Sequence, residues 1–227
     1  MPKIITSKEA AALIKSGDSI MFGGFVGCGT AMGVVNELAK IGTDNLTAMC
    51  NDGGRINADG TFYGIAPLIH NKQFKKFYAT HIGINPEIGQ QMKEGTLEVV
   101  LIPQGSFAEM IRAGGAGLGG IITPTGVGTI IEGYEYVQGK VNYDGVDYLI
   151  LKPLKADFAV IEGFKVDKAG NICYHGTARN FCPVMATAAK TVIVEAENLV
   201  EIGELDPDNI VTPGIFVDYI VYDGGNK

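Results

Sequence analysis

Short apolar runs alternate with amphipathic segments over most of the chain. This pattern predicts strands alternating with helices. A buried strand is a short run of apolar residues, whereas a helix has apolar residues three or four positions apart on one face. Such units pair their strands in parallel and bury both faces of the sheet under helices. We therefore expect an α/β fold with a mostly parallel sheet and helices on both faces. Strands are expected at 19–22, 46–50, 75–80, 97–102, 156–161, 191–195 and 216–222, and helices at 7–14, 32–40, 65–70, from 86, near 106–112 and at 181–190.

Residues 114–150 depart from this pattern. The glycine-rich run 114–120 is not expected to form a stable helix, and 123–129 is rich in turn residues. Residues 143–148 resemble the tip of a hairpin. We predict a small, loop-rich antiparallel lobe on one edge of the sheet. No linker separates the lobe from the rest, so residues 1–227 are expected to form a single domain.

Composition narrows the possible functions. The net charge of −7 provides no basic face for a nucleic acid, and the start of the chain lacks a signal-peptide core. No apolar stretch has the roughly 18–20 residues of a membrane span, so we expect no membrane association. The four cysteines form no C-x-x-C pair and have no histidine cluster beside them, so no metal site or redox dithiol is expected, and we expect a reducing, cytoplasmic location.

Glycines cluster directly after the first predicted strand of the sheet, and Phe25 stands among them; the loop residues are Gly23, Gly24, Phe25, Gly27 and Gly29. Small residues between a strand and a helix let a ligand approach the backbone, and the helix start offers free N–H groups to an anion. The dinucleotide fingerprint G-x-G-x-x-G is not met, because Met32 occupies its last position. A ligand loop is favoured, and a purely structural turn remains the alternative.

Two amide side chains follow apolar strands. Asn51 ends the strand at 46–50, and Gln104 stands in the sequence Pro103-Gln104-Gly105 after the strand at 97–102. Ligands of open α/β sheets collect at the carboxyl ends of the strands. An amide can donate a hydrogen bond to a carbonyl oxygen that becomes negative in a transition state. The two amides are therefore oxyanion-site candidates, and amides that only brace loops are an equal alternative.

Other reactive side chains lack companions in the sequence. Glu109, Glu132 and Glu195 have no specific partner, and the chain has no G-x-S-x-G elbow. His70, His81 and His175 lie far apart. Arg112 could bind a phosphate or carboxylate, but a surface ion pair is the preferred interpretation.

Six motifs together give the chain a family resemblance that extends from residue 4 to residue 222: 23–29, 50–52, 81–87, 103–117, 123–129 and 178–181. It resembles the alpha subunit of two-subunit, family I (3-oxoacid-type) CoA-transferases, which act in acetate, butyrate and acetoacetate metabolism. The family signature G-G-F-x-x-x-G-x-P is met except at its last position, where Ala31 replaces proline. Ala31 preserves helix initiation but loosens the exit of the loop.

The resemblance implies a reaction and a division of labour. A glutamate on the partner beta subunit would attack an acyl-CoA thioester, pass through a mixed anhydride and carry the CoA as a glutamyl thioester. Gln104 and Asn51 would support catalysis in this chain, while the glycine loop, Phe25 and Gly105 would shape the cleft. CoA and acyl-CoA would be substrates, with no permanently bound cofactor and no metal. The expected assembly with the beta subunit is an α2β2 or larger hetero-oligomer, with 114–120 and 123–129 near the contact.

Two other classes of function stay open at this stage. A sugar-phosphate isomerase or regulator of related fold would need a base and a cationic clamp, for which only Arg112 and Arg179 are available. A non-enzymatic scaffold would use its glycine segments to pack against a partner.

Overall fold

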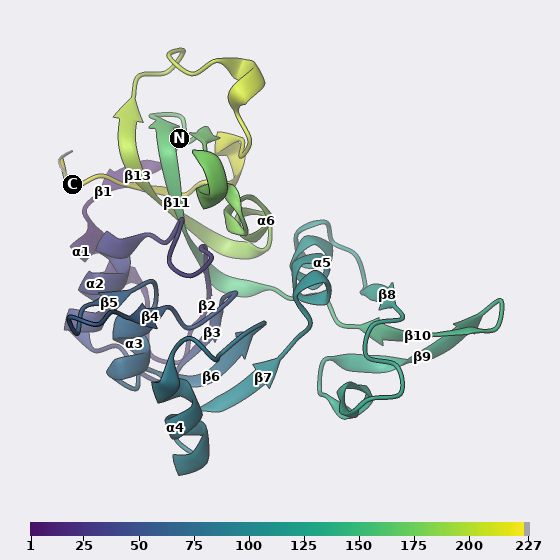
Figure 1. Cartoon of the computed structure of the whole chain (residues 1–227). Helices are drawn as coiled ribbons and strands as arrows, with labels where there is room; N and C mark the ends of the chain where they lie inside the picture. The colour runs from purple at the N-terminus through teal and green to yellow at the C-terminus, as the bar shows by residue number, and fades with distance from the viewer. Residues whose placement is uncertain (225–227) are drawn as a thin grey trace.

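A computed structural model describes residues 1–224, which form a central sheet with helices on both faces (Figure 1). The strand order is β1-β14-β13-β11-β2-β3-β6-β7, every neighbouring pair on this path is parallel, and β12 pairs antiparallel with β11. The predicted α/β class is confirmed. The strands are β1 Lys3–Ile5, β2 Ser19–Phe22, β3 Leu46–Met49, β6 Phe74–Ala79, β7 Glu98–Leu101, β11 Ala156–Asp167, β12 Ile172–Cys173, β13 Ala189–Val200 and β14 Tyr219–Val221.

Alternation along the central strands divides the core between the two faces of the sheet. In β2, Ile20 and Phe22 pack into one apolar cluster, whereas Met21 packs into the other. The first cluster takes in α1 Ser7–Leu13, α2 Met32–Ile41, α3 Ala66–His70 and α4 Pro86–Glu94. The second takes in α5 Gln104–Gly115 and α6 Cys182–Ala186. Both faces of the parallel sheet are thus buried, as its apolar strands require.

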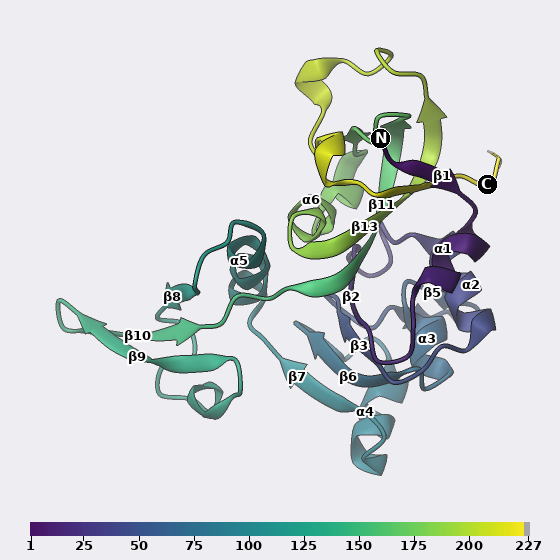
Figure 2. The ribbon, with the colours of Figure 1, turned by 180° about the vertical axis from the view of Figure 1, so that it is seen from behind.

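The predicted antiparallel lobe is present and projects beyond α5 and β7 (Figures 1 and 2). Its strands β8 Ile121–Thr123, β9 Val137–Tyr143 and β10 Val146–Leu151 pair in the order β8-β10-β9. The hairpin turns at Asp144 and Gly145, whose φ values of 51° and 81° fit a type I′ turn. Smaller elements are the pair β4 Arg55–Ile56 and β5 Phe62–Tyr63, and the 3₁₀ turns η1 Ile130–Gly133, η2 Gly176–Arg179, η3 Pro207–Asn209 and η4 Gly214–Phe216.

Polar contacts fix the lobe to the edge of the sheet. The Tyr78 hydroxyl donates to the Glu135 carboxylate at 2.6 Å, and Lys76 pairs with the same carboxylate. Burial and the bond to Glu135 raise the pKa of Tyr78 to about 12, which keeps its hydroxyl a donor at neutral pH. The Tyr136 hydroxyl donates to the Leu101 carbonyl oxygen at 3.2 Å. The segment between η1 and β9 is therefore held against β6 and β7.

The amino ends of three central strands are tied together by Asp157. Its carboxylate pairs with Lys190 at 2.8 Å and accepts from the Ser19 hydroxyl at 2.6 Å. The bonds from Lys190 and Ser19 lower the pKa of Asp157 to about 2. Each of the three residues lies at the start of a strand, so the contact fixes the alignment of β2, β11 and β13.

Several predicted boundaries were wrong. The helix expected at 181–190 ends at Ala186, and β13 begins three residues later, at Ala189. Strands β11 and β13 extend to Asp167 and Val200, well past the predicted ends, because they pair with each other along this whole length. Their outer halves carry charged and polar residues, which obscures the strand pattern in the sequence. The last strand is shorter than expected and starts at Tyr219.

Helix α5 is longer than predicted and includes two glycines. It runs through Gly114 and Gly115, so the expectation that 114–120 is entirely non-helical was wrong. A Cβ at Gly114 would lie 1.9 Å from the Leu154 carbonyl oxygen, and one at Gly115 would lie 2.0 Å from Thr187 Oγ1. The two glycines let α5 pack closely against these neighbours, and this packing overrides their low helix propensity. Among residues 1–224, no helix combines the length and apolar character of a membrane span.

Candidate functional site

Asn51 and Gln104 meet at the carboxyl edge of the sheet. Gln104 begins α5 just after β7, and its Nε2 donates to Asn51 Oδ1 at 2.6 Å. Thr80, just after β6, donates its hydroxyl to the same oxygen at 2.9 Å. Asn51 is only 2% exposed, whereas the Gln104 side chain lies at the surface. The structure thus brings the two predicted amides together, with the outer one oriented by the inner one.

Asp52 connects this amide pair to the glycine loop. Its Oδ2 accepts from Asn51 Nδ2 at 2.8 Å and from the Val26 N–H at 2.7 Å, and its Oδ1 accepts from the Gly54 N–H at 2.9 Å. The carboxylate is 2% exposed and is satisfied by these donors. Sequence reasoning missed this role, although Asp52 stands in the quoted motif at 50–52.

The glycine loop is a tight turn with an unusual backbone. Phe25 and Cys28 exchange two backbone hydrogen bonds of 3.0 Å, and Val26 and Gly27 between them have φ values of 50° and 83°. A β-branched residue in this region costs about 1–3 kcal/mol and persists only where the surroundings impose it. The bond from the Val26 N–H to Asp52 imposes it here. Phe25 is 44% exposed at the turn.

Neighbouring segments pack so closely on the loop that its glycines cannot carry side chains. A Cβ at Gly29 would lie 2.5 Å from the Ala178 carbonyl oxygen, and one at Gly23 would lie 2.5 Å from Cys182 Sγ. Burial raises the pKa of Cys182 to about 12, so it stays a thiol and donates to the Gly29 carbonyl oxygen at 3.3 Å. A Cβ at Gly27 would lie 2.3 Å from the Tyr63 ring. The loop is built to hold one conformation.

Asn180 also holds the glycine loop in place, through residues other than the one that Asp52 contacts. Its Oδ1 accepts from the Gly24 N–H at 3.1 Å, and its Nδ2 donates to the Cys28 carbonyl oxygen at 2.8 Å. Asn180 follows η2, far along the sequence from the loop. Its place in the motif at 178–181 was the only sequence signal, and that signal did not indicate this contact.

The start of α2 is not available to an anion in the way the sequence suggested. The N–H groups of Gly33 and Val34 donate at 3.0 Å to the two carboxylate oxygens of Glu195, which reaches over from β13. The expectation that the N–H groups of Gly33 and Val34 are free was therefore wrong. Ala31, at the N-cap position, has no side-chain acceptor, and the Glu195 carboxylate caps the helix in its place. Ala31 has a φ of −67°, the value that a proline would impose, so the helix begins without one.

The remaining sequence candidates lie in other contacts. Glu109 pairs with Arg112 at 2.7 Å on α5, which agrees with the surface ion pair preferred for this arginine. Glu132 accepts from the Gly128 N–H at 2.7 Å and pairs with Lys140. Residues 1–224 contain no group of three or more histidine, cysteine or acidic side chains placed to hold a metal ion.

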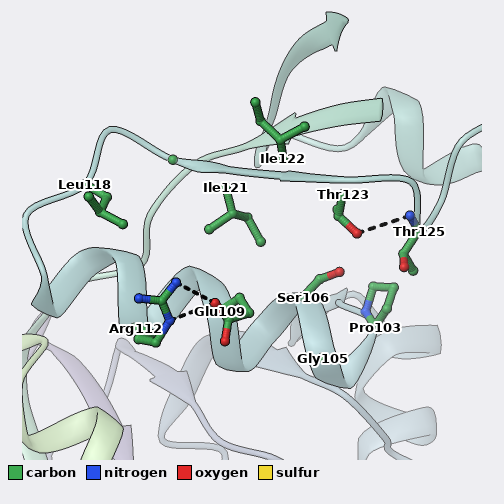
Figure 3. A pocket seen from close by; sticks show the side chains of 11 residues that line it. Pro103, Gly105, Ser106, Glu109, Arg112, Leu118, Ile121, Ile122, Thr123 and Thr125 are labelled. Atoms are coloured by element: carbon green, nitrogen blue, oxygen red, sulfur yellow. Dashed lines mark hydrogen bonds and ion pairs between the residues drawn. The ribbon is translucent and has the colours of Figure 1, made fainter. Parts of the chain in front are cut away.

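Two cavities flank the strand-to-helix connection that carries Gln104. One, of about 510 Å³, lies between α5 and the segment 118–125, and Gly105 and Ser106 line its end next to Gln104 (Figure 3). In Figure 3, Ser106, Glu109 and Arg112 lie on the helix opposite the segment that carries Ile121 and Thr123. The other, of about 330 Å³, lies between β7 and η1 and is lined by Thr80 and Pro103 among others.

Comparisons with known proteins agree with the earlier resemblance. The family model described as coenzyme A transferase matches residues 4–223. The acetate CoA-transferase subunit alpha of Escherichia coli K12 is 44% identical, with 99% of each chain covered. The alpha subunit of the acetoacetyl-CoA:acetate/butyrate CoA transferase of Clostridium acetobutylicum is 47% identical over 96% of this chain and 97% of that one.

Solved structures share the fold. A crystal structure of an acyl-CoA transferase from E. coli O157:H7, a thioester complex with CoA, superposes with a TM-score of 0.86 at 23% identity. The match covers 98% of this chain and 47% of that one. Glutaconate coenzyme A-transferase from Acidaminococcus fermentans gives 0.80 at 21% identity, covering 96% and 75%. The matching relatives give the sugar-phosphate alternative no support. With the family model spanning nearly its whole length, the chain belongs to the coenzyme A transferase family.

Proposed function

We propose that this chain is the alpha subunit of an enzyme that moves CoA between a short-chain acyl-CoA and a short-chain carboxylic or 3-oxo acid. Acetate, butyrate and acetoacetate are the substrates proposed, since the relatives named for these acids match almost end to end. The enzyme works in the cytoplasm as an α2β2 or larger hetero-oligomer with a beta subunit. Residues 1–227 form one domain of it.

The observation that carries this proposal is the amide pair at the carboxyl edge of the sheet. Gln104 is exposed and donates to a buried Asn51, which Thr80 and Asp52 hold in place. Gln104 therefore touches the substrate and donates its second N–H to the thioester oxygen as negative charge develops there. Asn51 is a positioning residue in this scheme. The loop at 23–29, with the exposed Phe25 at its turn, and Gly105 form the wall of the cleft.

The attacking carboxylate belongs to the partner. Three candidate glutamates of this chain are engaged elsewhere: Glu109 with Arg112, Glu132 with Lys140, and Glu195 at the start of α2. A glutamate of the beta subunit attacks the acyl-CoA carbonyl carbon and expels CoA thiolate, which leaves a mixed anhydride. The thiolate then attacks the glutamyl carbonyl and releases the first acid. The incoming acid takes the CoA by the same steps in reverse, with one thioester replaced by another.

The test compares the purified chain alone with the chain mixed with its beta subunit. CoA transfer from acetyl-CoA to butyrate or acetoacetate is expected only in the mixture, because the nucleophile and the amides must share one cleft. Transfer by the purified single chain would overturn the divided site. No transfer to any short-chain acid by the assembled complex would overturn the proposed substrates.

A further inference from the structure

The 330 Å³ cavity between β7 and the lobe has an apolar lining. Leu101, Ile102 and Pro103 form one wall, and Ile130, Ile131 and Tyr134 form the other. The described residues that line it include no acidic or basic side chain. Small-molecule sites of about 300–1,000 Å³ combine such apolar walls with a few polar groups that set orientation.

The polar end of this cavity lies beside the amide pair, Asn51 and Gln104. Thr80 lines the cavity and donates its hydroxyl to Asn51 Oδ1, the atom that also accepts from Gln104. Pro103, which precedes Gln104, lines the cavity as well. Of the two cavities beside Gln104, this one therefore offers an apolar space to a group held there, whereas the 510 Å³ cavity is lined by the charged Glu109 and Arg112.

The wall formed by the lobe is held in a fixed position. Ile131 packs over the turn at Gly126, where a Cβ would lie 2.8 Å from its Cγ2. Glu135, just beyond Tyr134, is tied to Tyr78 and Lys76 on β6. A wall that is fixed from both sides can discriminate by size, because it cannot retreat from a larger group.

We propose that this cavity receives the alkyl part of the acyl group and that Ile131 limits its length. The proposal rests on the proposed function and goes further by naming the residue that sets chain length: among the proposed monocarboxylic acids, those longer than acetate place their unbranched alkyl chain in this cavity. Dicarboxylic acids such as succinate are rejected, because their second carboxylate would enter an apolar space with no cation to meet it.

The test uses the assembled alpha–beta complex, with acetyl-CoA as the CoA donor for butyrate and butyryl-CoA as the donor for acetate. In Ile131→Phe, the added ring fills the cavity, so kcat/KM for butyrate falls at least about tenfold, since a methylene is worth roughly 10- to 200-fold in such pockets. Acetate, which does not reach Ile131, changes by less than about threefold on the same scale. Ile131→Ala is expected to raise the ratio of hexanoate to butyrate use.

A second variant tests the rejection of dicarboxylic acids. Ile130 is 79% exposed at the cavity, so Ile130→Lys is expected to fold normally. It adds a cation where the second carboxylate would lie and should raise succinate use relative to butyrate by about two- to fivefold, the effect of an exposed ion pair. The matched control is Ile215→Lys, at a position that is 90% exposed in η4, and it should change no substrate ratio.

The outcomes separate the inference from the function on which it rests. Equal effects of Ile131→Phe on acetate and butyrate, or no effect on either, would refute the acyl pocket while leaving CoA transfer intact. A wild-type complex that transfers CoA to none of these acids would refute the proposed function first. Succinate used as well as butyrate by the wild-type complex would refute the apolar selection.

Discussion

Gln104→Ala is the substitution that most sharply separates a catalytic amide from a structural one. The side chain lies at the surface at the start of α5, and its Nε2 donates to Asn51 Oδ1 at 2.6 Å, a neutral amide–amide hydrogen bond. Losing that bond costs about 0.5–1.5 kcal/mol of folding free energy. Losing a donor to a developing oxyanion costs about 2.7–4 kcal/mol of transition-state stabilisation, which is a factor of about 10²–10³ in kcat.

The assay is steady-state CoA transfer by the alpha–beta complex, read alongside thermal denaturation of the same variant. We expect kcat to fall by two to three orders of magnitude with a much smaller change in KM, because the donor acts chiefly in the transition state. Gln90→Ala is the matched control, since Gln90 is an exposed glutamine of α4 whose side chain donates to its helical neighbour Glu94 at 2.8 Å. Full activity of Gln104→Ala in a correctly assembled complex would refute the oxyanion role and favour a scaffold or loop-bracing role.

Two further predictions concern the loop and the sheet. Gly29 and Gly60 have φ values of 85° and 81°, but a Cβ meets the Ala178 carbonyl oxygen at 2.5 Å only at Gly29, while Gly60 has open space. Gly60→Ala should therefore cost about 1–2 kcal/mol in urea denaturation, and Gly29→Ala distinctly more, with loss of activity; equal costs would contradict the packing argument. The ion pair and hydrogen bonds of Asp157 lower its pKa in the folded protein to about 2, below the unfolded value near 3.9. These contacts therefore stabilise the fold above pH 4, and their contribution is lost as the pH falls toward 2. In Asp157→Asn, the free energy of unfolding should therefore depend less on pH between pH 4 and 2. The difference should be less than about 1 kcal/mol, because the Asp157 side chain is 35% exposed, and an unchanged pH dependence would contradict the stabilising role of Asp157.

The order of elements could be predicted from the sequence because most elements carry local signals. The capping box of α1 is present, with the Glu9 N–H donating to the Thr6 hydroxyl at 3.2 Å and the Glu9 carboxylate accepting from the Thr6 N–H. Asn85 caps α4, with Pro86 at its first turn. Each of these signals lies within a few residues of the helix end that it predicts, so the local sequence is sufficient to place that end.

What could not be predicted depends on residues distant in the sequence. Glu195 satisfies the start of α2, 162 residues before it, and nothing local to either segment indicates that contact. The helical glycines at 114 and 115 are explained only by the neighbours that α5 meets in space. In the site, both amides could be found from the ends of their strands, but the bracing by Asp52 and Asn180 appears only once the loop is folded.

The central claim is that this chain supplies amides and loop to a cleft whose attacking carboxylate comes from the partner. The most direct measurement is to incubate the alpha–beta complex with acyl-CoA, trap the glutamyl thioester chemically, and map it by peptide mass spectrometry. The account predicts one modified glutamate, located in the beta subunit, with residues 1–227 unlabelled. A trapped thioester on any carboxylate of this chain would contradict it.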